Sequence, residues 1–113
     1  MRHIALFGHG PNWKKGASVY EQGAPIEGHL ASMRRHFETG VLLLGGPFDR
    51  GGGIAVLDVA EETAATAIMD ADPAVAAGVL TYTLHAHHAY FDAFTGAGTP
   101  LSVPELALQR ERG

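Results

Sequence analysis

The chain has 113 residues, with 46% hydrophobic and 18% charged side chains, a balance that suits one compact domain with a modest core. It contains no cysteine, which excludes disulfides, thiolate catalysis and cysteine zinc sites. Its formal net charge is −4 and its basic residues form no stripe, so nucleic acid is not an expected partner. No apolar stretch resembles a signal core or approaches the ~18 residues of a membrane helix. We therefore expect a cytoplasmic protein that does not contact membranes.

The N-terminal part of the sequence predicts a strand, a loop and a helix. A short apolar run over residues 3–9 indicates the strand. Residues 10–24 are glycine-rich and lack periodicity, but Trp13 and Tyr20 give this predicted loop aromatic surface that could cover a site. A helix is expected over residues 25–40, from a proline to a C-cap glycine, because apolar residues recur at helical spacing: Ile26, Leu30, Met33 and Phe37.

The middle of the sequence predicts a β-hairpin followed by two helices. Apolar stretches at residues 41–48 and 53–59 flank the turn-forming segment Asp49-Arg50-Gly51-Gly52. An alanine-rich segment over residues 60–71, with acidic residues in its first turn, suits a helix. The Asp-Pro pair that opens residues 72–78 is typical of the N-cap and first position of one further helical turn.

The last predicted strand runs from residue 79 to about residue 90, where the composition favours β structure. Beyond it, Ser102 and Glu105 form a capping-box pattern for a short terminal helix. We therefore expect a core domain over residues 1–90 and a C-terminal extension, residues 91–113, that packs on a partner subunit.

The predicted order β-α-β-β-α-β is that of the α+β ferredoxin-like fold, or split βαβ fold. Its four strands form an antiparallel sheet of order 4-1-3-2 with both helices on one face. Alternation places Ala5, Phe7, Ile54 and Val56 on one side of this sheet, and Ile4, Leu6, Ala55 and Leu57 on the other. Both sides are apolar, so a second copy of the chain is expected to cover the helix-free side in a dimer or a higher oligomer.

This topology predicts that two residues distant in sequence converge. The first helix and the last strand both begin at the edge of the sheet where the first strand ends, so His29 and Asp72 should meet there. A histidine beside a carboxylate is an acid–base device, because the acid orients the ring while its other nitrogen exchanges a proton with substrate. The alternative is that His29 is an ordinary interface histidine and Asp72 only caps a helical turn.

Further residues should reach the same edge. The aromatic loop and the end of the second strand both lie there in this topology, which predicts a set of substrate-binding residues: Phe7, His9, Trp13, Gly46, Pro47 and Phe48.

No metal site is predicted, but a second group of histidines, at the opposite edge of the sheet, offers candidate metal ligands. His85 and His87 share one face of the last strand. Antiparallel pairing with the first strand could bring His3 to the same face, giving three nitrogens suited to zinc, copper or nickel. The alternative is that these histidines are polar strand ends with no metal, and no further ligand is evident in the sequence.

Two segments resemble conserved blocks of the YCII-related family. The first combines His29-Leu30-Ala31 with the run Glu38-Thr39-Gly40-Val41-Leu42-Leu43-Leu44-Gly45-Gly46-Pro47, and the second is Ala71-Asp72-Pro73-Ala74-Val75-Ala76-Ala77-Gly78-Val79. The resemblance covers roughly residues 3–90. It implies a dimeric α+β barrel in which two ferredoxin-like sheets face each other. It also implies that His29 and Asp72 are the active-site pair, because they match the family's helix histidine and Asp-Pro aspartate.

Relatives in that family include a dehydrochlorinase of aromatic degradation, and the wider superfamily includes muconolactone isomerase and small monooxygenases. The resemblance therefore implies a lyase or isomerase without an organic cofactor, acting on a small cyclic, hydroxylated or carbonyl compound. His29 would be the general acid–base and Asp72 would orient it. The alternatives are a non-catalytic metabolite-binding or accessory module, in which the two residues would be too far apart to bond, and a histidine-rich metal-binding protein.

Overall fold

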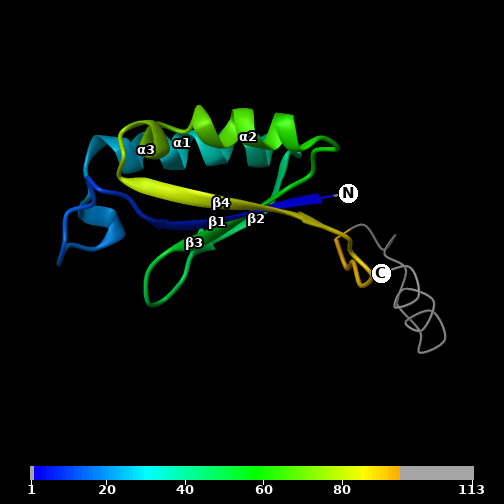
Figure 1. Cartoon of the computed structure of the whole chain (residues 1–113), viewed down its shortest axis with the longest axis horizontal. Coiled ribbons are helices and arrows are strands. Elements are labelled where there is room, and N and C mark those ends of the chain that lie inside the picture. The colour runs from blue at the N-terminus through cyan, green and yellow to red at the C-terminus, as the bar shows by residue number, and fades with distance from the viewer. Residues whose placement is uncertain (1, 95–113) are drawn as a thin grey trace.

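A computed structural model describes residues 2–94, which form an antiparallel sheet with helices on one face (Figure 1). The strands are β1 (Arg2–His9), β2 (Leu42–Pro47), β3 (Gly53–Leu57) and β4 (Leu80–His87), in the sheet order β2-β3-β1-β4. The helices are α1 (Ala24–Glu38), α2 (Glu62–Asp70) and the single-turn α3 (Pro73–Ala76), with a 3₁₀ turn, η1 (Val19–Glu21), before α1. The predicted ferredoxin-like α+β fold and its sheet order 4-1-3-2 are confirmed.

Local sequence accounts for the ends of the helices and for the hairpin. Pro25 lies in the first turn of α1, and Gly40 follows the helix with a φ of 82°, the left-handed conformation that glycine adopts most easily. Gly51 and Gly52 have positive φ angles and turn the chain between β2 and β3. None of the helices in residues 2–94 combines the length and the hydropathy that crossing a membrane requires.

The register of β1 on β3 decides which residues face the helices. Ala5 pairs with Ala55 and His3 pairs with Leu57, so these residues share the helix-covered face. The predicted faces of β3 were therefore wrong, because Ala55 and Leu57 lie on the side of Ala5 and Phe7, and Ile54 and Val56 lie on the other side. Alternation within one strand is readable from sequence, but which residues of two strands share a face depends on the register in which the strands pair.

The core lies between this face and the helices. Leu57 and Met69 are its largest fully buried apolar side chains. The stripe predicted for α1 is only partly buried, because Ile26 enters the core whereas Leu30 is 57% and Phe37 is 64% exposed. The apolar spacing therefore predicted the helix correctly, although half of the residues in the stripe are largely exposed.

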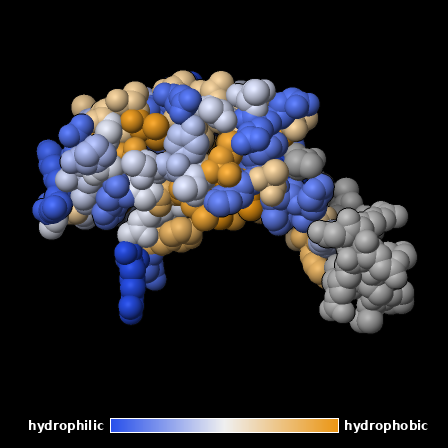
Figure 2. Space-filling model, viewed as in Figure 1, coloured by the Kyte–Doolittle hydropathy of each residue, from blue (hydrophilic) through white to orange (hydrophobic). Residues whose placement is uncertain are grey.

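The opposite face of the sheet carries no helix and is partly apolar. Leu6, in the central strand β1, is 38% exposed there, and Leu44 of the edge strand β2 is also exposed. Figure 2 shows hydrophobic side chains reaching the hollowed lower side of the molecule, below the sheet. An exposed apolar face of this kind is typical of a surface that another protein surface covers.

The chain after β4 folds back on the start of β1. The guanidinium group of Arg2 forms an ion pair with Asp92 and lies over the ring of Phe94. The described part of the extension therefore packs on its own chain. Ser102, Glu105 and residues 95–113, which were expected to form a terminal helix and to reach a partner subunit, lie outside the described residues.

A side-chain hydrogen bond ties α2 to β4 and generates a stability prediction. The hydroxyl of Tyr82 donates to Asp70 at 2.6 Å, and this bond, with smaller effects of burial and of the Asp70 charge, raises the pKa of Tyr82 from 10.0. Replacing Tyr82 with Phe should lower the free energy of unfolding near neutral pH by about 0.5 to 1.5 kcal/mol. Because the folded pKa is raised, the bond stabilises the fold fully below pH 10.0 and is lost as the pH rises through the folded value.

Denaturant unfolding of the wild type and Tyr82→Phe, measured at about pH 7 and at about pH 11, checks this expectation. The two proteins should differ in stability at the lower pH, and this difference should shrink as the pH rises above 10.0. Tyr90→Phe is the matched control, because Tyr90 forms no hydrogen bond with the residues described here. A Tyr82→Phe protein as stable as the wild type near neutral pH would contradict the prediction.

Candidate active site

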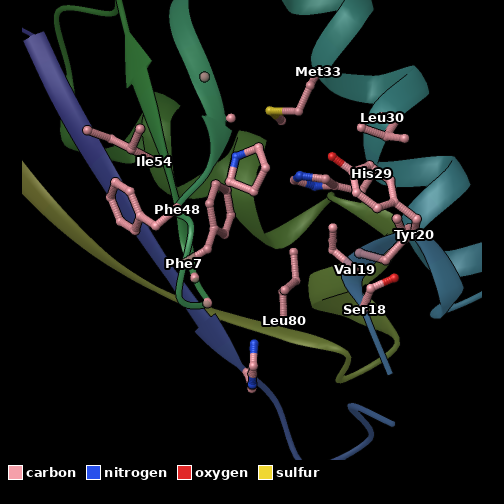
Figure 3. Close-up of a pocket in the computed structure, with 18 of the residues that line it drawn as sticks. Phe7, Ser18, Val19, Tyr20, His29, Leu30, Met33, Phe48, Ile54 and Leu80 are labelled. Carbon is pink, nitrogen blue, oxygen red and sulfur yellow. The ribbon is translucent and has the colours of Figure 1, made fainter. Parts of the chain in front are cut away.

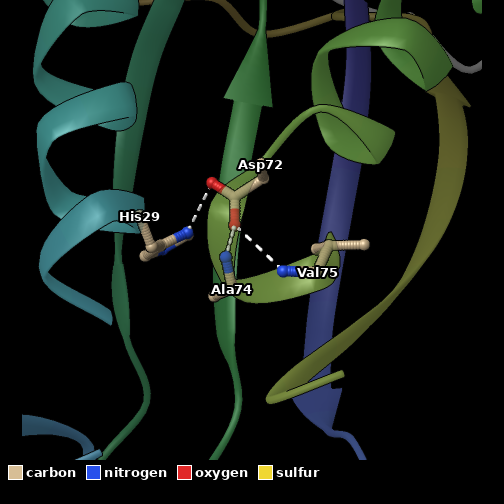
Figure 4. Close-up of polar contacts among 4 residues, drawn as sticks. All are labelled: His29, Asp72, Ala74 and Val75. Atoms are coloured by element: carbon tan, nitrogen blue, oxygen red, sulfur yellow. Dashed lines mark hydrogen bonds and ion pairs between the residues drawn. The ribbon is translucent and has the colours of Figure 1, made fainter. Parts of the chain in front are cut away.

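The predicted meeting of His29 and Asp72 is confirmed. His29 lies in the second turn of α1 and Asp72 immediately precedes α3, and Nδ1 of His29 is 2.8 Å from Oδ1 of Asp72 (Figure 4). The contact joins residues 43 positions apart in sequence. It forms because both helices begin beyond the same edge of the sheet, as the topology predicted.

Asp72 also caps α3, as the alternative interpretation of this residue predicted, in addition to contacting His29. Its second oxygen, Oδ2, accepts hydrogen bonds from the backbone N–H groups of Ala74 at 3.1 Å and Val75 at 3.3 Å (Figure 4). Asp72 is 0% exposed, and together with His29 these donors give its carboxylate three N–H partners. A buried carboxylate requires such donors, and the helix cap and the contact with His29 together supply them.

Gly28 permits the close approach of α1 to α3. A Cβ atom at this position would lie 2.8 Å from Cβ of Pro73, a separation at which one of the two helices has to shift. Gly28 directly precedes His29, and Pro73 directly follows Asp72. The absence of a side chain at Gly28 therefore sets the distance over which the imidazole reaches the carboxylate.

The hydrogen bond assigns roles to the two nitrogens of His29. An ionised carboxylate only accepts hydrogen bonds, so Nδ1 carries the proton that it shares with Asp72. Nε2 then has the lone pair of the neutral ring, and within residues 2–94 it has no hydrogen-bond partner. The ring of Phe7 holds the imidazole from the side in an edge-to-face contact, with 5.3 Å between the ring centroids.

A cavity of about 670 Å³ lies beside His29, between α1, the 10–24 loop, the end of β1 and the β2–β3 hairpin. Figure 3 shows the imidazole of His29 pointing into it, together with Phe7, Phe48, Met33 and Leu80. Most lining side chains are apolar or aromatic. The lining includes all six residues predicted to bind substrate: Phe7, His9, Trp13, Gly46, Pro47 and Phe48.

Gln22 is a residue of this site that the sequence did not indicate. Its side chain is buried and accepts a hydrogen bond from the backbone N–H of Lys14 at 2.7 Å. Its amide nitrogen lies within hydrogen-bond distance of three carbonyl oxygens of the same loop, those of Lys14, Ala17 and Ser18. One amide thus fixes the loop that forms a wall of the cavity. The segment before α1 has no periodicity, and a single glutamine within it carries no sequence signal that it orders the loop.

The predicted three-histidine cluster does not form, because His3 lies on the wrong face of the sheet. His3 pairs with Ala86, so its side chain points opposite to those of His85 and His87. It is buried on the helix side, where Nδ1 is 3.0 Å from the carbonyl oxygen of Val59, while His85 hydrogen-bonds Thr83 on the other face. Within residues 2–94 no group of three histidine or acidic side chains is placed to hold a metal ion.

Comparisons with known proteins identify the family and agree with the fold. The sequence profile of the YCII-related domain matches residues 5–99, whereas no curated protein matches the sequence of the chain. Among solved structures, a 5-chloro-2-hydroxyhydroquinone dehydrochlorinase from Burkholderia phenoliruptrix, in complex with 2,5-dihydroxybenzoquinone, is similar to this chain with a TM-score of 0.58 and 14% identity, over 77% of this chain and 94% of that one. At this identity the likeness concerns the fold alone. Because the profile spans most of the chain, from β1 to beyond β4, the protein belongs to the YCII-related domain family.

Proposed function

We propose that the protein is a small-molecule lyase or isomerase in which His29 is the general acid–base and Asp72 orients it. The observation that carries this proposal is the 2.8 Å hydrogen bond between Nδ1 of His29 and the buried Asp72, on an imidazole that points into a cavity. Such an arrangement leaves Nε2 available to substrate and provides a negative charge that compensates a protonated ring.

The chemistry begins with transfer of a substrate proton to Nε2 of His29. The imidazolium that forms keeps its Nδ1–H on Asp72, whose charge stabilises it. In an isomerisation, the same nitrogen returns the proton to another atom of the substrate. In an elimination, a leaving group departs with its bonding electrons and the proton remains to be released to solvent.

The walls of the cavity favour a small cyclic substrate that carries hydroxyl or carbonyl groups. Phe7, Phe48 and Trp13 present aromatic surface to the cavity, and its volume of about 670 Å³ suits a single small molecule. The structural neighbour acts on a chlorinated hydroxyhydroquinone and binds a dihydroxybenzoquinone. By analogy with that neighbour, we propose the same class of oxygenated ring compounds as substrates of this protein and dehydrochlorination as its reaction.

The hydrogen bond also favours an enzyme over a non-catalytic binding module. A cavity that only binds a metabolite has no need for a histidine that a buried acid holds in one tautomer. For such a module we expected His29 and Asp72 to be too far apart to form a hydrogen bond. A distance of 2.8 Å between Nδ1 and Oδ1 supports the catalytic alternative.

We further propose that a second copy of the chain covers the helix-free face of the sheet, as the sequence predicted. Leu6 is exposed in the middle of this face, and its neighbours there, Ile4 and Val56, are also apolar. We propose an identical sheet as the partner of this apolar surface, because a two-fold axis brings the same apolar patch of both copies into one interface.

The catalytic proposal predicts a loss of turnover on substitution of either member of the pair. With 5-chloro-2-hydroxyhydroquinone as the probe, His29→Ala should lower the rate of chloride release by about 10²- to 10⁴-fold, because the proton acceptor is gone. Asp72→Asn should have a similar effect. The single carbonyl oxygen of Asn can still cap α3, but its amide N–H₂ then faces Nδ1 and reverses the tautomer of His29.

His36→Ala is the matched control, since His36 lies on the same helix and does not line the cavity. Chloride release is measured by ion chromatography, and circular dichroism checks that the variants fold. Undiminished turnover in either active-site variant would contradict the proposed roles.

Gly28→Ala tests the geometry without removing a reacting group. Alanine favours helix by about 1 kcal/mol over glycine, yet its Cβ would meet Pro73 at 2.8 Å and separate α1 from α3. We expect turnover to fall at least about tenfold, because displacement of His29 by a fraction of an ångström weakens its alignment with Asp72. Ala31→Gly is a control that changes helix propensity on the same helix. Unchanged turnover in Gly28→Ala would show that the close approach is not required.

The proposed dimer predicts that a charge in the middle of the helix-free face dissociates it. Leu6→Lys should convert a dimer into a monomer when its mass is measured by light scattering after gel filtration, because an unpaired buried ammonium group is costly. Phe37→Lys places the same residue at an exposed apolar position of α1 and should leave the dimer intact. Dissociation of only the second variant would place the interface on the helices and contradict the proposal.

A further inference from the structure

His9 is a second histidine of the cavity, and neither the hydrogen bond to Asp72 nor the core uses it. It is the last residue of β1, two positions beyond Phe7 and on the same face of the strand. Phe7 contacts the ring of His29, and both histidines line the same cavity. His9 is also solvent-exposed, which places it near the rim.

Trp13 holds the imidazole of His9 in a defined plane. The two rings stack with 3.8 Å between their centroids and an interplanar angle of 6°. The edge of the imidazole formed by Cε1 and Nε2 lies over Gly51 of the hairpin, where a Cβ atom would be 3.5 Å from both atoms. An indole face also stabilises a positive charge on the ring that it covers. His9 is thus held between the loop and the hairpin although it is exposed.

The ring nitrogens of His9 remain available to a ligand. Within residues 2–94, neither Nδ1 nor Nε2 forms a hydrogen bond or an ion pair. Asp49 and Arg50 also line the cavity, but within residues 2–94 their side chains form no hydrogen bond or ion pair. His9 is therefore a polar group of the cavity that is oriented by its neighbours and unpartnered within residues 2–94.

We infer that His9 is a second substrate-binding group, which donates a hydrogen bond to a hydroxyl or carbonyl oxygen on the part of the ring remote from His29. This inference rests on the proposed function and adds to it that the substrate carries oxygens at two separate positions of the ring. His29 then binds the reacting end, and His9 with Trp13 holds the other end at the rim. A hydrogen bond from the imidazole is strongest when that oxygen is anionic.

Trp13 is the only tryptophan of the sequence, so its fluorescence reports directly on this end of the cavity. The full chain is titrated with 2,5-dihydroxybenzoquinone, and saturable quenching of Trp13 gives the dissociation constant. His9→Phe retains an aromatic ring to stack on Trp13 and removes both nitrogens. We expect it to weaken binding by about 10- to 100-fold, the usual effect of losing a hydrogen bond to a charged group.

Two further variants complete the experiment. His88→Phe is the same substitution at an exposed histidine that does not line the cavity, and it should bind like the wild type. His9→Gln keeps a donor without the ring and should bind between His9→Phe and the wild type. Isothermal titration calorimetry repeats the measurements without relying on fluorescence.

The outcomes separate this inference from the function on which it rests. Binding by His9→Phe within twofold of the wild type would overturn the role of His9 and leave the proposed acid–base pair intact. An absence of saturable binding by the wild type would overturn both the class of ring substrate and the inference. Weak binding by His9→Phe, with His88→Phe unchanged, supports both.

Discussion

The buried carboxylate of Asp72 is the constraint on which the site and the surrounding fold depend. An ionised carboxylate that is 0% exposed has lost its hydration and must be compensated by donors that the protein holds in place. Asp72 obtains two donors from the backbone of α3 and one from His29. One carboxylate oxygen of Asp72 is hydrogen-bonded to α1 and the other to α3. Loss of either interaction would leave a buried, charged oxygen without its hydrogen-bond donor. Stability therefore requires the same arrangement that the proposed chemistry requires.

The single turn that Asp72 caps also anchors the wall of the cavity. Gly78, which follows α3, accepts a hydrogen bond from the backbone N–H of Asn12, and the side chain of Asn12 donates to Ala77. A Cβ atom at Gly10 would lie within the radius of the Gly78 carbonyl oxygen, so the loop approaches this turn more closely than a side chain allows. The turn after Asp72 thus positions the start of the 10–24 loop as well as His29. A four-residue helix of little intrinsic stability is maintained by these contacts from two directions.

The sequence predicted the parts of this arrangement that follow from topology. Once the order of elements indicated a split βαβ fold, the end of β1 and the starts of α1 and β4 had to share one edge, and the meeting of His29 with Asp72 followed. The errors concern relations between strands. His3 was assigned to the face of His85, and Ala55 to the face opposite Ala5, because alternation along a strand gives no phase relative to its neighbour. Phe37 of α1 is exposed, which shows a similar limit for helices. Helical spacing identifies an apolar stripe, but it does not show whether that stripe is buried.

The loop could not be predicted because its order depends on one side chain that has no local signal. Gln22 binds backbone groups at three positions between Lys14 and Ser18, and nothing in the spacing or type of these residues marks them as its partners. Aperiodic segments are ordered by such specific hydrogen bonds, since they have no repeating pattern to bury. With Gln22 at its end and Asn12 near its start, the loop is tied down on both sides of Trp13. The indole of Trp13 therefore belongs to a wall of the cavity that hydrogen bonds hold in place. The sequence indicated that this side chain could cover the site, and in the structure it stacks on the imidazole of His9.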